Sequence, residues 1–243
     1  MSWIELPADH PTPSLVIDSA VVDRNLQRMQ GYCDEHGLRL RPHTKTHKSV
    51  RMAKRQIDFG AGGLTVAKVG EAEQMAHASS DLFLAYPAIG PARLRRLEQL
   101  ARACAENSGG RVALGVDSQA AAEGIASAAQ RAGVAIGIMV DLDVGFHRTG
   151  IESSQQAIDL CAWVSQQRGL EFRGLMCFPG HILPAASQES WTQYHDAIAK
   201  VIDRLRSIGI EVPVVSGGST PTAKESHRNP ILNEIRPGTY IYN

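Results

Sequence analysis

From residue 38 onward the sequence alternates between short apolar runs and longer amphipathic stretches, and this alternation restricts the possible folds more than any other feature. The short runs have the length of strands, and the longer stretches carry apolar residues at helical spacing. We predict strands over residues 38–44, 62–66, 81–86, 111–116, 134–141, 170–178, 211–216 and 232–242. We predict helices over residues 48–59, 69–79, 91–106, 118–132, 153–168 and 187–208.

The number of these units predicts the fold class. Eight strands, most of them followed by a helix in units of about twenty-five residues, indicate an α/β protein of the (β/α)8 TIM-barrel type, because open doubly wound sheets usually contain five or six strands. Ahead of the barrel, residues 13–18 are predicted as a strand and residues 19–36 as a helix that ends at Gly37. Between the last two strands the helical pattern is weakest.

Composition bounds the function. The 243 residues, 43% of them hydrophobic, suit one domain with a large core. Equal numbers of basic and acidic residues, 25 each, give no electrostatic reason to expect nucleic acid or an anionic membrane as a partner. Without a secretory signal or a membrane-spanning window, we expect a cytoplasmic protein. Four widely spaced cysteines are expected as reduced, buried thiols: Cys33, Cys104, Cys161 and Cys177.

Polar residues gather at the predicted carboxyl ends of four strands. In a parallel barrel these strand ends meet on one rim, where barrel enzymes carry their active sites. We therefore expect the four stretches to form a single site. They are RPHTKTHK at 41–48, DLDVGFHRTG at 141–150, CFPGH at 177–181 and SGGSTPT at 216–222.

The first stretch contains two lysines and two histidines within six residues. Lys45 lies two residues beyond His43, so in an extended strand both side chains point to the same side, whereas Lys48 lies at or beyond the start of the next helix. Lys45 is therefore the better candidate for a nucleophilic amine. Alternatively, His43 and His47 could bind a metal ion, although H-x-x-x-H spacing suits a helix face and barrel metallohydrolases usually begin with H-x-H.

The stretch at 216–222 has the composition of a phosphate-binding loop. Gly217 and Gly218 allow the backbone to approach an anion, and Ser219 and Thr220 add hydroxyl donors. An ordinary Gly-Ser turn is the alternative. A phosphate site opposite a lysine at a strand end suggests a phosphorylated aldehyde cofactor that Lys45 holds as an imine.

Two further residues on the expected rim are candidates. His181 follows Pro179-Gly180 and is either a loop residue or a general acid/base. Arg148 is a fixed cation that could polarise a phenolate-like oxygen of the cofactor, or could form a salt bridge with Asp143.

On these motifs the chain resembles the D-threonine aldolase and D-serine dehydratase group, whose barrel is of the alanine racemase N-terminal type (pyridoxal-phosphate fold type III). The resemblance covers nearly the whole chain. It rests on RPHTKTHK at 41–48, TVAKVGEAE at 65–73, DVGFHRTG at 143–150, PGH at 179–181, GGSTPT at 217–222 and RPGTYIYN at 236–243.

The resemblance implies roles for individual residues. Lys45 would hold pyridoxal 5'-phosphate (PLP) as an imine, Arg148 would bond the ring hydroxyl of the cofactor, and His181 would act as acid/base near the β-hydroxyl of the substrate. The phosphate would be surrounded by Gly217, Gly218, Ser219, Thr220 and Tyr240.

The resemblance also implies a reaction and a larger protein. The reaction would be cleavage of a D-3-hydroxy amino acid to glycine and an aldehyde, by a homodimer. Relatives carry a further β-domain with a His-x-Asp or His-x-Cys pair that holds a divalent metal, Mn²⁺ or Zn²⁺, so we expect no metal ligands in this chain. We expect residues 1–243 to be the PLP-binding barrel of a truncated protein, with strand 13–18 pairing with that absent domain. Phe178 departs from the tyrosine that relatives often have.

Several alternatives remain open. A dehydratase acting on D-serine or D-3-hydroxyaspartate would use Lys45 to remove the Cα proton, and an amino-acid racemase would take its tyrosine base from the absent domain. A PLP carrier protein would be a lone barrel of about this size with little catalysis. A metal-dependent barrel hydrolase would bind zinc and lack a chromophore.

Overall fold

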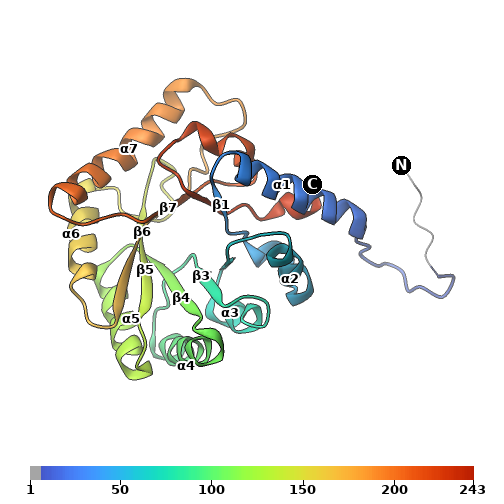
Figure 1. Ribbon diagram of the computed structural model, residues 1–243, viewed down its shortest axis with the longest axis horizontal. Coiled ribbons are helices and arrows are strands. Elements are labelled where there is room, and N and C mark those ends of the chain that lie inside the picture. The colour runs from blue at the N-terminus through green and yellow to red at the C-terminus, as the bar shows by residue number, and fades with distance from the viewer. Residues whose placement is uncertain (1–6) are drawn as a thin grey trace.

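The structure is a computed structural model that describes residues 7–243, and it contains eight parallel strands with helices around them (Figure 1). The strands are β1 (Arg39–Leu40), β2 (Leu64–Val66), β3 (Asp81–Leu84), β4 (Arg111–Val116), β5 (Ile136–Leu142), β6 (Leu170–Cys177), β7 (Val214–Gly217) and β8 (Glu234–Ile235). The α-helices are α1 (Ser19–Glu35), α2 (Val50–Asp58), α3 (Val69–Met75), α4 (Pro91–Ser108), α5 (Gln119–Ala132), α6 (Ser154–Ser165) and α7 (Gln188–Ser207). Short 3-10 helices are η1 (Thr44–Thr46), η2 (Ala223–Arg228) and η3 (Thr239–Tyr242).

The strands form a closed ring. Hydrogen-bonded neighbours follow the order β1-β8-β7-β6-β5-β4-β3-β2, and a parallel bridge between His43 and Thr65 joins the two ends. Two backbone hydrogen bonds support this closure, from Gly62 N to Leu40 O at 2.8 Å and from Thr65 N to Pro42 O at 2.9 Å. The predicted (β/α)8 barrel is therefore confirmed.

The helices cover the outside of the barrel, and their boundaries follow the local sequence (Figure 1). Pro91 begins α4, where its missing N–H is not needed, and the Ser153 side chain accepts a hydrogen bond from Gln156 N at the start of α6. Gly133 ends α5 in the left-handed region that favours glycine. Between β7 and β8 the chain forms only η2, which agrees with the weak helical pattern there.

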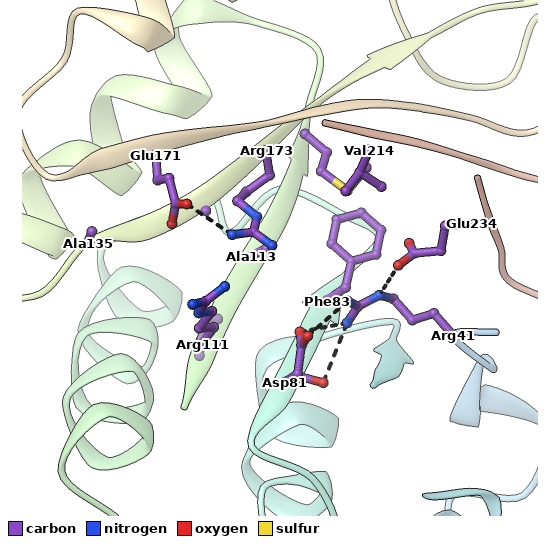
Figure 2. Close-up of a pocket in the computed structure, with 13 residues that line it drawn as sticks. Arg41, Asp81, Phe83, Arg111, Ala113, Ala135, Glu171, Arg173, Val214 and Glu234 are labelled. Carbon is purple, nitrogen blue, oxygen red and sulfur yellow. Dashed lines mark hydrogen bonds and ion pairs between the residues drawn. The ribbon is translucent and has the colours of Figure 1, made fainter. Parts of the chain in front are cut away.

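A polar network fills the closed end of the barrel interior, at the amino ends of the strands. Arg41 donates from Nε to a carboxylate oxygen of Glu234 at 2.7 Å and from Nη1 to Asp81 at 2.8 Å (Figure 2). Burial alone would lower the pKa of Arg41, but Glu234 and Asp81 raise it above its ordinary value. A small cavity of about 40 Å³ remains beside Phe83. In barrels this end contributes stability, so we assign Arg41 to the fold and not to the site.

Three predicted strands differ clearly from the structure. Of the predicted strand 38–44 only Arg39–Leu40 form β1, and the chain enters η1 at Thr44, so Lys45 lies in a turn and not in an extended strand. Residues 13–18 form no strand within this chain, and Leu15 is fully exposed on a segment that runs away from the barrel (Figure 1). Pairing of this segment with a further domain stays a prediction. The predicted strand 232–242 is too long, because Pro237 has no N–H to continue the ladder and the chain turns into η3.

The expectation that the cysteines are reduced and buried is confirmed. All four cysteines are free and buried. Across residues 7–243, no helix combines the length and the hydropathy needed to cross a membrane.

Candidate active site

A cavity of about 470 Å³ opens at the carboxyl ends of the strands, within the size range of small-molecule sites. Loops that follow β1, β5, β6, β7 and β8 all contribute to its wall, including the four stretches predicted to meet there. Its principal lining residues are His43, Lys45, Thr46, Ala67, Ala85, Tyr86, Arg148, Thr149, Met176, Phe178, Gly218, Ser219, Thr220, Arg236, Gly238 and Thr239.

Lys45 lies in the single turn η1, directly after β1. The imidazole Nδ1 of His43 caps this turn by accepting a hydrogen bond from Lys45 N at 3.3 Å. Burial lowers the pKa of Lys45 below its ordinary value, and the positive charge of Arg148 lowers it further. A larger fraction of the amine is therefore neutral near pH 7, as nucleophilic attack on a carbonyl requires.

The two histidines of this stretch serve the fold. Burial and the neighbouring cation of Lys45 lower the pKa of His43 to about 3, so the ring is neutral. His47 accepts from Ser49 N at 3.0 Å through Nδ1, and its Nε2 lies 3.1 Å from Gln56 Oε1. Both nitrogens of His47 are thus engaged, and the geometry does not support a metal site at His43 and His47.

The loop after β7 lines the same cavity as Lys45. Gly218 adopts a φ of 75°, and Ser219 and Thr220 line the wall beside it. Thr220 Oγ1 accepts from Gly238 N at 2.9 Å, which ties this loop to the segment after β8. Hydroxyls and backbone N–H groups next to a glycine are the donors that a phosphate group requires, so the wall fits the phosphate of PLP.

Two residues assigned to the phosphate by resemblance do not line this cavity. Gly217 lies within β7, where a Cβ atom would come 2.4 Å from the hydroxyl of Tyr194, so its small size serves packing. Tyr240 is buried in η3, and its hydroxyl accepts from Gln56 Nε2 at 3.2 Å. It lines a separate hollow on the other side of Thr220.

Arg148 is free to face the cavity. Its guanidinium carbon lies 4.1 Å from the centroid of the Phe178 ring, a cation–π contact. The alternative salt bridge to Asp143 does not form, because one oxygen of that carboxylate accepts from the backbone N–H groups of Gly145, Phe146 and His147. The other oxygen lies 3.1 Å from Nδ1 of His147.

His181 lies on the rim and not in the wall. Its ring is exposed and stacks on Phe146, with 6.5 Å between the ring centroids. The structure therefore brings Lys45, Arg148 and the loop after β7 together in one cavity wall, while His181 lies outside that wall.

Sequence reasoning missed two buried charged groups at the cavity. Arg236 donates to Ser216 Oγ and, at 2.8 Å, to Cys177 O, so its guanidinium is fixed in the wall. Asp141, beside it in the barrel mouth, is 7% exposed, and burial raises its pKa to about 6. Both begin stretches quoted above, RPGTYIYN at 236–243 and DLDVGFHRTG at 141–150, but nothing in either stretch marks its first residue as a site residue and not a structural one.

Fold and site together define the class of protein. Residues 17–243 match the family described as alanine racemase, N-terminal domain, and the chain belongs to this PLP-dependent family. The predicted resemblance is thereby confirmed.

Individual relatives include both aldolases and dehydratases. The chain is 30% identical to D-threonine aldolase of an Arthrobacter species and 35% identical to D-threo-3-hydroxyaspartate dehydratase of a Delftia species; each alignment covers 95% of the chain and 61% of the relative. The crystal structure of D-threonine aldolase from Filomicrobium marinum superposes with a TM-score of 0.88 at 32% identity, over 95% of this chain and 62% of that one. The chain thus spans about three fifths of the length of these relatives.

Proposed function

We propose that the protein is a PLP-dependent lyase that cleaves D-3-hydroxy amino acids in the manner of a D-threonine aldolase. The observation that supports this most is that Lys45 and the Gly218–Thr220 loop line one cavity. A cofactor that carries an aldehyde at one end and a phosphate at the other could therefore contact both. When bound, its ring would accept the electron pair released at Cα of the substrate.

The residues of the chain divide the remaining tasks. Lys45 would hold the cofactor covalently through Nζ, with Ser219 and Thr220 donating to the phosphate and Arg148 donating to the ring hydroxyl. His181 would accept the proton of the β-hydroxyl as the Cα–Cβ bond breaks, and its place on the rim requires the substrate to extend past Phe178. The divalent metal implied by the resemblance would be held outside this chain.

A side pocket favours substrates with an uncharged side chain. This pocket of about 140 Å³ shares Ala85, Tyr86 and Thr149 with the main cavity and is also lined by Asp117 and Asp141. Burial raises the pKa of Asp141 to about 6, so above that pH its charged carboxylate would repel the second carboxylate of 3-hydroxyaspartate. This supports a D-threonine-like substrate, with a dehydratase acting on D-serine as the second candidate.

Two measurements on the native protein test the proposal. Absorbance near ~420 nm, and a borohydride-reduced adduct mapped to Lys45, are expected if a lysine imine forms. Lys45→Ala should abolish both signals, and Lys48→Ala, three residues further along and exposed, should abolish neither.

Product analysis then separates the reactions. Glycine and acetaldehyde from D-threonine are expected. Pyruvate from D-serine without glycine from D-threonine would replace the aldolase by the dehydratase.

A further inference from the structure

Glu71 is a buried carboxylate beside the turn that carries Lys45, and the mechanism above does not use it. It lies in α3 and is 6% exposed. Its Oε1 accepts from Thr44 Oγ1 at 3.0 Å, and its Oε2 accepts from Ala67 N at 2.8 Å. Burial of a carboxylate is costly unless both oxygens are satisfied, and here each oxygen has a donor.

Through Thr44 this carboxylate fixes the turn η1. Thr44 is fully buried, directly precedes Lys45, and also contacts Thr65 O through Oγ1 at 3.2 Å. Ala67, which holds the other oxygen of Glu71, lines the cavity just after β2. One side chain therefore ties the turn after β1 to the turn after β2, on the side of the cavity where Lys45 stands.

Glu71 also places a negative charge near Lys45, whereas the other charged groups that act on this amine are cations. Besides burial, the groups that shift the pKa of Lys45 are Arg148 and Arg236, which lower it, and Glu71, which raises it. The carboxylate thus opposes two guanidinium groups that face the same amine.

We propose that Glu71 is a positioning residue for Lys45. It holds the turn η1 through Thr44 and places a carboxylate on the side of the cavity where the amine lies. The use of Lys45 as the cofactor lysine rests on the proposed function, whereas the coupling between Glu71 and the amine does not.

The substitution Glu71→Gln separates the charge from the tether. The amide can accept from Ala67 N through its oxygen and donate to Thr44 Oγ1 through its nitrogen, so the hydrogen bonds are kept while the negative charge is lost. Thr44→Val makes the opposite change, since it removes the hydroxyl and leaves the charge. Glu73→Gln on the same helix, where Glu73 pairs with Arg96 at the surface, is the matched control.

The experiment measures the reactivity of the amine itself and needs neither substrate nor turnover. The purified chain is treated with hydroxylamine to free its lysines of carbonyl compounds, and Lys45 is labelled with an amine-specific acylating reagent between pH 6 and 11. The labelled fraction is read by peptide mass analysis, and circular dichroism confirms that each variant is folded.

We expect the plot of Lys45 labelling rate against pH to move to lower pH in Glu71→Gln. Labelling should be about threefold faster at pH 8, because the negative charge that favours the protonated amine is lost. Glu73→Gln should follow the wild type. Thr44→Val should keep the midpoint of the profile and change the limiting rate at high pH.

An unchanged profile in a folded Glu71→Gln variant would overturn the proposal. If that variant does not fold, Thr44→Val with both an unchanged midpoint and an unchanged limiting rate would also overturn it. A protein that shows the expected profiles but no band near ~420 nm and no lyase activity would refute the proposed function alone.

Discussion

Glu234 provides the sharpest test of how the barrel interior is held together. It is 1% exposed, it pairs with Arg41 at 2.7 Å, and it accepts from Ser216 Oγ at 2.7 Å. Glu234→Gln keeps the volume but places an amide next to a buried guanidinium. Removing one partner of a buried ion pair costs about 3–5 kcal/mol, and we expect the lower end, about 3 kcal/mol, because Asp81 still faces Arg41.

For a chain of this length each kcal/mol corresponds to roughly 2–4 °C, so the thermal midpoint should fall by roughly 6–12 °C. Scanning calorimetry of the protein without added ligand measures this. The control is Glu171→Gln, since Glu171 lines the same cavity but pairs with Arg173 (Figure 2). The Glu171 side chain is 51% exposed in that pair, and such pairs contribute about 1 kcal/mol or less. Equal shifts in the two variants would refute the reasoning that burial sets the cost.

Two further predictions concern a buried carboxylate and a crowded glycine. Burial raises the pKa of Asp141 from 3.8 to about 6. The stability that this group contributes is therefore complete below pH 3.8 and is lost as the pH rises through 6. The free energy of unfolding should change by about 3 kcal/mol over this range. Asp141→Asn should therefore raise the thermal midpoint more at pH 8 than at pH 5, and an equal rise at both would contradict this. Gly174→Ala should prevent folding, because the new Cβ atom would lie 1.9 Å from Val214 O. Gly209→Ala has open space around it and should lower the free energy of unfolding by only about 1–2 kcal/mol. Recovery of both variants in folded form would disprove the steric argument.

The fold could be predicted because its signals are local. Strand length, helical periodicity and end residues such as Pro91 and Ser153 each act within a few positions, and parallel topology then places all carboxyl ends on one rim. This rule brought the stretches that contain Lys45 and Arg148 to one rim, and both residues line the same cavity; the choice of these two residues within the stretches came from their chemistry and from the family resemblance.

The parts that could not be predicted depend on contacts between distant segments. The packing of η3 decides whether Tyr240 contacts the loop after β7 or Gln56, and the spacing of residues in the sequence does not predict that packing. Likewise Glu71 looks like any acidic residue in the first turn of a helix, and only the fold places it against Thr44. Residues 13–18 have the composition of a strand but form none in the described residues, and their pairing with a further domain stays a prediction.

The hydrogen bonds inside the barrel form one uninterrupted path between its two ends. Arg236, in the wall of the cavity, donates to Ser216, which donates to Glu234, which holds Arg41, which in turn holds Asp81. Hydrogen bonds therefore connect the end of the barrel that holds Asp81 to the end that carries the cavity. A ligand that pulls Arg236 toward itself would act on every hydrogen bond of this path. Part of its binding energy would therefore make the opposite end of the barrel more rigid.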